Sequence, residues 1–389
     1  MTEPAPRPPK PRRPVTQTTP FRVGAVLALL FVFLVGVHGL GDGFKLLGRD
    51  FLESFFAATS SPFIGLIVGL LATTLVQSSS VTTAMIVGLV AAPEDPLPIA
   101  NAVPMIMGAN IGTTVTNTLV SLAHMGRREE FRRAFAVATC HDFFNFLTVA
   151  ILLPLELATG YLRRFATAIA AQIGHVGGVE YESPLKHALA AVFAPLKATG
   201  AALFSGRGQA IFLILASGAL IYLALMLVVR VMRSAMEQRV ESFVTRALGR
   251  SVLLSMLIGA IATVMVQSSS ITTALLVPLA GAGLITLRQA FPITVGANIG
   301  TTVTALLASL AASGPNALAG LTIAVVHLLF NASGALLILP VPFMQRLPLT
   351  AAQALANVAA RSRRWAVVYV LGLFYLLPAS LALINRLLR

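Results

Sequence analysis

The distribution of charged residues divides the chain into long apolar stretches and short polar segments. Asp, Glu, Lys and Arg are absent from four stretches, which are Ser54–Pro93, Pro96–Gly126, Ser251–Leu287 and Gln289–Gln345. A helix crosses the apolar core of a bilayer with about 20 apolar residues. Each stretch is long enough for at least one such helix, so the pattern predicts an all-α polytopic membrane protein.

The same pattern sets the limits of individual segments. Residues 1–22 contain seven prolines and five basic residues, and their low apolar content predicts a disordered cytoplasmic tail. The first span is expected from Val23 to about Leu40. Further spans are expected at Leu97–Ala123, Ala134–Pro154, Ala210–Val229 and Trp365–Ile384.

Composition narrows the class of protein. Of the 389 residues, 57% are hydrophobic and 11% charged, whereas soluble domains carry about 25% charged residues. The net charge of +14 comes from basic clusters between apolar spans, which is the positive-inside pattern and not the basic groove of a nucleic-acid-binding protein. The single cysteine, Cys140, excludes an internal disulfide framework. Because no nucleophile elbow, Cys/His cluster or lysine-containing phosphate loop is present, we expect no enzyme.

Three blocks of sequence occur twice, in the same order. TTLVQSSSVTTAM (73–85) recurs as TVMVQSSSITTAL (263–275), and GANIGTTVT at 108–116 recurs unchanged at 296–304. The pair His141 and Asn145 recurs as His327 and Asn331. The chain therefore consists of two homologous halves, 23–155 and 210–342, with a connector at 156–209 and a C-terminal extension at 343–389 that holds the last span.

The charge pattern also predicts the orientation of the two halves. With the tail inside the cell, the arginines at 127–133 and the basic segment 230–250 lie inside, and the connector lies outside. The halves then enter the membrane from opposite sides, as in the inverted-topology repeats of many transporters. The two segments around QSSS are apolar, with a polar cluster in the middle, which is typical of re-entrant hairpins and broken helices.

The QSSS clusters are the strongest candidates for chemistry. A hydroxyl or amide without a partner costs several kcal/mol in hydrocarbon, so such a cluster marks a packing seam or a wet site. One cluster alone would most often be packing, but two in register favour a site. A helix broken at Ser78–Ser80 presents free N–H groups that suit a small oxyanion, and side-chain oxygens suit Na⁺. Because no motif contains Lys or Arg, the pattern favours coupled cation–anion transport.

These motifs resemble a known family. The paired QSSS segments, GANIGTTVTN and the run RREEFRRAFAVATCHDFFNFLTVAILLPLE are similar to the type II sodium-dependent phosphate cotransporter family in its bacterial form, over about residues 23–385. The resemblance implies sodium-coupled symport of inorganic phosphate by alternating access, in a multi-pass protein of the bacterial plasma (inner) membrane. Animal members have a long disulfide-bonded external loop, whose roles do not transfer because the connector here lacks Cys. The stoichiometry, electrogenic or electroneutral, stays open.

Carried over residue by residue, the resemblance implies one central site at the two hairpin tips. Phosphate contacts are expected from Gln77, Ser78, Ser79, Ser80, Asn110, Thr113, Gln267, Ser268, Ser269, Ser270, Asn298 and Thr301. Sodium, the co-transported ion, is expected at Gln77, Thr82, Thr114, Gln267, Thr272 and Thr302. Supporting hydrogen bonds to the hairpins are expected from His141, Asn145, His327 and Asn331.

Asp142 is the only acid deep in a predicted span, and its counterpart in the second half is Leu328. An acid inside the membrane is a functional candidate, but a structural partner for His141 or for a neighbouring backbone group explains it equally well. We group Asp142 with the four supporting residues above. Two alternatives to phosphate symport also stay open: transport of another oxyanion such as sulfate or a dicarboxylate, and a non-transporting membrane scaffold or sensor. The expected partners are phosphate, sodium and the lipid bilayer, with a homodimer as an open option and no nucleic acid.

Overall fold

The computed structural model describes residues 19–47, 61–93, 95–176, 184–247, 251–312 and 314–387. Nearly all of these residues are helical and none of them forms a strand, which confirms the all-α prediction. The described residues include five helices long and apolar enough to cross a membrane: Arg128–Thr159, Arg207–Ala224, Leu287–Ser309, Ala317–Ile338 and Arg364–Ile384. The last of these covers the predicted final span, Trp365–Ile384.

The first half consists of a helical hairpin, a broken helix and one long helix. Helices α3 (Pro62–Val76) and α4 (Ser79–Val90) form the hairpin, and α5 (Ile99–Gly112), α6 (Val115–Leu122) and α7 (Arg128–Thr159) follow. The segment expected as a span at 97–123 is divided into two helices at Thr113 and Thr114. The hydroxyls of these threonines donate to the carbonyls of Ala109 and Ile111, bonds that compete with the regular helix.

The second half repeats this order with the interruption in a different place. Its helices are α11 (Val252–Val266), α12 (Ser269–Ala274), α13 (Leu276–Gly281), α14 (Leu287–Ser309) and α15 (Ala317–Ile338). Here α14 is continuous, although it carries the same GANIGTTVT sequence that is split in the first half. The hairpin arm is broken instead, between α12 and α13, where Pro278 has no N–H to donate to the carbonyl of Ala274.

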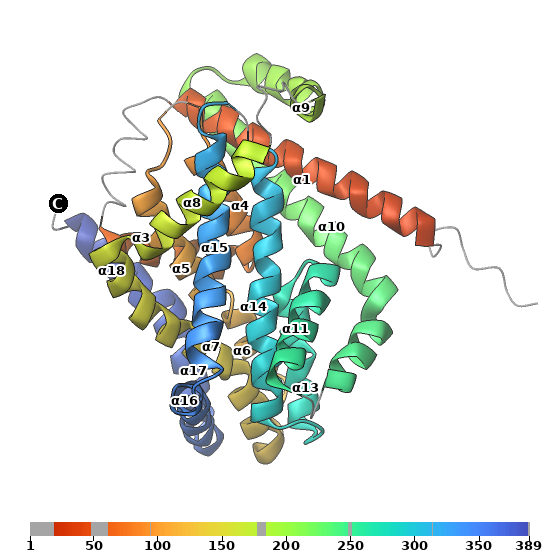
Figure 1. Ribbon diagram of the computed structural model, residues 1–389, viewed down its shortest axis with the longest axis vertical. Coiled ribbons are helices and arrows are strands. Elements are labelled where there is room, and N and C mark those ends of the chain that lie inside the picture. The colour runs from red at the N-terminus through yellow and green to blue at the C-terminus, as the bar shows by residue number, and fades with distance from the viewer. Residues whose placement is uncertain are drawn as a thin grey trace, which may run out of the picture.

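The remaining helices lie outside the repeated blocks. They are α1 (Thr19–Leu47), α8 (Tyr161–Val176), α9 (Pro184–Leu203), α10 (Arg207–Ala247), α16 (Pro342–Arg361), α17 (Arg364–Leu371), the π-helix η2 (Gly372–Leu376) and α18 (Leu377–Leu387). Helices α1 and α10 pack along each other (Figure 1). Because α1 begins at Thr19, the last four residues of the tail expected to be disordered are helical; residues 1–18 lie outside the described residues.

Two contacts between the halves define the direction of each. The guanidinium of Arg133, near the start of α7, donates to the carbonyl of Gly281 at the end of α13 (3.1 and 2.8 Å). The amide of Asn316, just before α15, donates to the carbonyl of Ala92 at the end of the first hairpin (2.6 Å). Helix α5 starts near the second contact and α14 near the first, so α5–α6 and α14 run in opposite directions (Figure 1).

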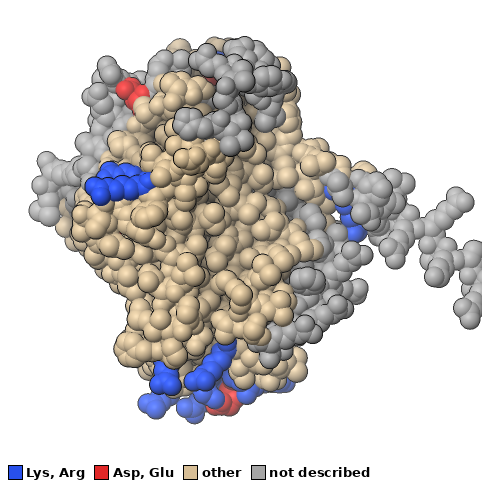
Figure 2. Space-filling model, in the orientation of Figure 1, with Lys and Arg blue, Asp and Glu red and all other residues tan. Residues whose placement is uncertain are grey.

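Charge is concentrated at one end of the molecule. Of the Lys and Arg side chains coloured in Figure 2, most lie at the lower end, where Figure 1 places α16; a few lie higher at the sides, and a broad uncharged surface lies between. Large apolar side chains of the C-terminal helices, such as Trp365 and Leu376, are exposed on the protein surface. This division suits a protein whose middle contacts lipid and whose basic end contacts water.

Glycines allow one arm of each hairpin to pack directly against the helix that carries the GANIG motif. A Cβ atom added to Gly108 on α5 would lie 1.9 Å from the carbonyl oxygen of Leu66 on α3. In the second half, a Cβ on Gly296 of α14 would lie 1.8 Å from the carbonyl oxygen of Met256 on α11. Only glycine allows backbones to approach this closely. The glycines of the two GANIG motifs therefore fix where the outer arm of each hairpin lies.

Candidate functional site

The tip of each hairpin contains a glutamine in a left-handed backbone conformation. Gln77 has φ 57° and ψ 27°, and Gln267 has φ 55° and ψ 29°. Such a conformation costs a residue with a side chain about 1–2 kcal/mol, so its presence at both tips is a constraint that the surrounding structure imposes. The helix break lies at Gln77–Ser78, not at Ser78–Ser80 as predicted, and Ser79 and Ser80 already belong to α4.

The second residue of each motif caps the helix that follows. The Oγ atom of Ser78 accepts from the N–H of Val81 (3.4 Å), and that of Ser268 accepts from the N–H of Ile271 (3.4 Å). The first backbone N–H groups of a helix have no partner within the helix. Each tip therefore directs hydroxyls and the positive end of a helix dipole toward the space beyond it.

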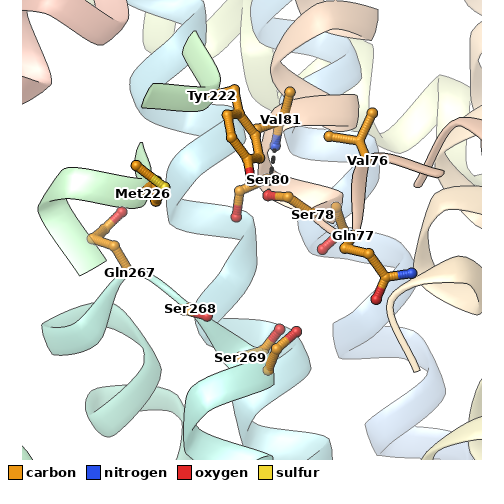
Figure 3. Close-up of a pocket in the computed structure, with 12 residues that line it drawn as sticks. Val76, Gln77, Ser78, Ser80, Val81, Tyr222, Met226, Gln267, Ser268 and Ser269 are labelled. Atoms are coloured by element: carbon orange, nitrogen blue, oxygen red, sulfur yellow. Dashed lines mark hydrogen bonds between the residues drawn. The ribbon is translucent and has the colours of Figure 1, made fainter. Parts of the chain in front are cut away.

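The two tips line a single pocket with a volume of about 180 Å³ (Figure 3). A buried water needs only about 10–15 Å³ measured in this way, so a small ion with some water fits. None of the lining residues is charged. They are Gln77, Ser78, Ser79, Ser80, Gln267, Ser268, Ser269 and Ser270 from the two motifs, with Val76, Val81, Tyr222 and Met226.

Matching threonines orient the two tip glutamines. The carbonyl oxygen of the Gln77 side chain accepts from the hydroxyl of Thr116 (3.1 Å), and that of Gln267 accepts from Thr304 (3.2 Å). The amide nitrogen of Gln77 donates to the backbone carbonyl of Thr74, three residues earlier, and that of Gln267 donates in the same way to Val264. The hydrogen bonds that each glutamine side chain makes within its own half are therefore the same in both halves.

The residues expected to complete the site from the GANIGTT blocks do not line this pocket. Asn110 and Asn298 are almost fully buried. The expected threonines donate their hydroxyl protons to carbonyls of their own helices, and this holds for Thr82, Thr113, Thr114, Thr272, Thr301 and Thr302. The structure therefore places the predicted residues in two groups, one at the pocket and one within the helices beside it.

The second group is organised by a layer of buried amides and imidazoles that joins the halves. His141 of the first half bonds to the Oδ1 atom of Asn298 in the second, and His327 of the second bonds to Oδ1 of Asn110 in the first (3.4 Å). Asn145 accepts from the amide of Asn298 (2.9 Å). In addition, Asn331 donates to Oδ1 of Asn110 (3.1 Å).

These bonds correct one prediction. His141, Asn145, His327 and Asn331 were expected to support the hairpin tips. They bond instead to the asparagines of the two GANIG motifs, Asn110 and Asn298. A polar group buried without a partner costs about 1–3 kcal/mol. The layer therefore holds the halves in one register, because any slip would leave several such groups unpaired.

Asp142 has a partner that the sequence did not indicate. The carboxylate is fully buried, and its Oδ2 atom accepts from the hydroxyl of Tyr369 on α17 (2.6 Å). The side chains of Thr114 and Thr118 lie beside it, but their hydroxyls donate to backbone carbonyls, and the Oδ1 atom of Asp142 has no hydrogen-bond partner among the described residues. His141, the structural partner considered from the sequence, bonds to Asn298. Asp142 therefore belongs to a buried cluster of oxygen atoms formed by α6, α7 and the C-terminal helix.

The sequence around both hairpins is similar to that of a known protein family. The chain matches the Na⁺/Pi-cotransporter family over residues 32–179 and 220–343, which include both QSSS and both GANIGTT blocks. The chain belongs to the Na⁺/Pi-cotransporter family. This confirms the resemblance stated from the motifs.

Similarity to individual members of the Na⁺/Pi-cotransporter family extends over most of the chain. It is 35% identical to the rat sodium-dependent phosphate transport protein 2A in an alignment 427 positions long, which covers 92% of this chain and 67% of the relative. It is 33% identical to the human sodium-dependent phosphate transport protein 2B in an alignment 448 positions long, which covers 92% of this chain and 64% of the relative. No solved structure matches the chain.

Several residues at the pocket and the buried acid of this cotransporter-family member were not predicted from the sequence. Thr116 and Thr304 lie inside the repeated GANIGTTVT block, so the repeat itself was a usable signal. Tyr222 and Met226 lie on α10, outside the repeated motifs, and Tyr369 and Tyr375 lie on the C-terminal helices. No spacing or repeat marks these four residues in the sequence, and only the packing of distant helices brings them to the site.

Proposed function

We propose that this member of the Na⁺/Pi-cotransporter family is a sodium-driven phosphate symporter that alternates access to the pocket between its hairpin tips. One observation carries the proposal: QSSS motifs from two halves that run in opposite directions line the same uncharged pocket. The relatives named as sodium-dependent phosphate transport proteins support the choice of substrates.

The lining of the pocket suits a tetrahedral oxyanion that binds together with cations. Serine hydroxyls, glutamine amides and the free N–H groups of α4 and α12 donate hydrogen bonds from several directions. Because no Lys or Arg lines the pocket, sodium must balance the charge of phosphate. Monohydrogen phosphate with two Na⁺ is neutral, and a third Na⁺ couples transport to the membrane potential by about 2.3 kcal/mol per 100 mV.

Oxygen atoms near the pocket are suited to the cations. We assign sodium to the side-chain oxygens of the tip glutamines and to the predicted threonines, which are Thr82, Thr114, Thr272 and Thr302. Support is strongest at Thr114, because its side chain lies beside Asp142, whose buried Oδ1 atom has no hydrogen-bond partner in the described part of the chain, and hard cations prefer carboxylate, hydroxyl and carbonyl oxygens. The equivalent of Asp142 in the second half is Leu328, so the cation sites would differ between the halves.

The arrangement of the hairpins supports an alternating mechanism and an orientation. The first hairpin ends at the Asn316–Ala92 contact and the second at the Arg133–Gly281 contact, which belong to opposite ends of the molecule. Rocking of one half against the other would open the pocket toward each end in turn. We place the arginine-rich end in the cytoplasm and the protein in the plasma membrane, in accordance with the positive-inside rule.

Uptake of radioactive phosphate by proteoliposomes tests the proposal. An inward sodium gradient should drive uptake by the wild type, while Gln77→Ala and Gln267→Ala should abolish it without loss of folded protein. Gln353→Ala is a matched control, since the Gln353 side chain donates to the exposed Asn357 side chain on α16 and does not line the pocket. Absence of sodium-dependent uptake by folded wild-type protein would refute symport and favour a scaffold or sensor. Normal uptake by either tip variant would refute the pocket as the site.

A further inference from the structure

The C-terminal helices contact the transport machinery although they lie outside both repeats. The family match ends at residue 343, whereas α17, η2 and α18 occupy residues 364–387. Nevertheless α17 packs against α6, and η2 and α18 pack against α3, the outer arm of the first hairpin. These helices therefore have polar as well as apolar neighbours in the first half.

Two tyrosines of this segment reach the two polar clusters of the first half. The hydroxyl of Tyr369 donates to Asp142 (2.6 Å). The hydroxyl of Tyr375 accepts from the side-chain amide of Gln77 (3.3 Å) and donates to the backbone carbonyl of Thr74 (3.5 Å). One short segment thus contacts both the buried acid and the glutamine at the pocket.

The second half has no equivalent of either contact among the described residues. The amide nitrogen of Gln267 donates to the carbonyl of Val264, and no tyrosine bond to it is present there. The position equivalent to Asp142 is Leu328. The two halves have nearly the same motifs, and the C-terminal segment adds to the first half a tyrosine at the tip glutamine and another at the buried acid.

The backbone of this segment departs from a regular α-helix before Tyr375. A π-helical turn, η2, lies between Leu371 and Leu377 and includes Tyr375. Such turns are rare and are frequent at functional sites, and the extra residue in the turn changes the direction in which later side chains point. The turn therefore separates the direction of Tyr369, toward α7, from that of Tyr375, toward α3.

We propose that Tyr375 and Tyr369 are positioning residues for transport, which rests on the proposed symport function. Tyr375 holds the amide of Gln77 so that a defined face of it is presented to the anion in the pocket. Tyr369 holds the carboxylate of Asp142 so that its oxygens, with the hydroxyl of Thr114, face the cation. The C-terminal helix thus tunes anion binding and cation binding through separate side chains.

Kinetic measurements on two conservative variants separate these roles. In Tyr375→Phe, the phosphate concentration for half-maximal uptake at saturating sodium should rise about fivefold, as expected for loss of one neutral hydrogen bond worth about 1 kcal/mol. In Tyr369→Phe, the sodium concentration for half-maximal uptake should rise about tenfold or more, because a bond to a carboxylate is worth about 1.5–3 kcal/mol. The maximal rate should stay within about twofold in both, since Phe preserves the packing.

Tyr161→Phe is the matched control, because its hydroxyl bonds to Ser333 (3.1 Å) away from the pocket; neither half-saturation value should change. If the tyrosines are merely structural, the two test variants will have lower thermal stability or a lower maximal rate, with both half-saturation values at wild-type levels. That result would overturn the inference but leave symport itself standing. If folded wild-type protein shows no sodium-dependent uptake in the same vesicles, the proposed function fails, and the inference fails with it.

Discussion

Replacement of glycines along the contact between α3 and α5 should impair transport in proportion to how closely the backbones approach. A Cβ atom at Gly65, Gly112 or Gly108 would lie 3.3, 2.7 or 1.9 Å, respectively, from a backbone oxygen of the facing helix. Real Cβ contacts are essentially never shorter than 3.0 Å. The alanine variants should therefore rank Gly65, Gly112, Gly108 in order of increasing damage.

The size of the largest effect follows from the same distance. To accommodate Gly108→Ala, α3 and α5 must separate by about 1 Å, because a close-packed interior does not compress. Overpacking of this kind costs about 1–3 kcal/mol. Gln77 ends α3, so the hairpin tip moves with the helix. We expect a lower unfolding temperature and, with the same cost applied to the position of the tip, a loss of uptake of about 5- to 150-fold, at about 1.4 kcal/mol per decade.

The assay is sodium-driven phosphate uptake combined with thermal unfolding in detergent. Gly218→Ala on α10 is the control, because a Cβ there would meet no atom within 4 Å. It should be neutral or slightly stabilising, since alanine favours a helix over glycine by about 1 kcal/mol. Equal effects at Gly65 and Gly108, or full activity of Gly108→Ala, would refute the argument that backbone contact positions the hairpin.

Two further predictions concern orientation and selectivity. In a Cys140→Ala background, a cysteine introduced by Ser205→Cys should react with an impermeant reagent in intact cells, whereas one introduced by Gly126→Cys should react only after permeabilisation. The reverse pattern would contradict the proposed orientation. Arsenate should inhibit uptake strongly and sulfate weakly, because sulfate lacks the proton that an oxygen in the pocket accepts from monohydrogen phosphate. An unpaired buried acceptor costs about 1–3 kcal/mol, which weakens sulfate binding about 5- to 150-fold. Equal inhibition by sulfate in competition assays would favour transport of oxyanions in general.

The sequence determined much of the architecture, because the features concerned are carried by neighbouring residues. Stretches without charge can be stable only in lipid or protein interior, so the helical membrane fold followed from composition. A repeated QSSS motif within an apolar segment indicated a broken hairpin, and the structure has one in each half, with Gln77 and Gln267 in the same conformation. Chemistry at the pocket was readable for the same reason.

Tertiary structure alone decided which polar groups meet. The identical GANIGTTVT blocks form a broken helix in one half and a continuous one in the other, so the local sequence did not determine their shape. The pairing of His141 with Asn298, of Tyr369 with Asp142 and of Tyr375 with Gln77 joins residues more than 150 positions apart. Such contacts depend on how whole helices pack. A buried polar group takes whichever partner that packing brings near it, and no local pattern encodes the choice.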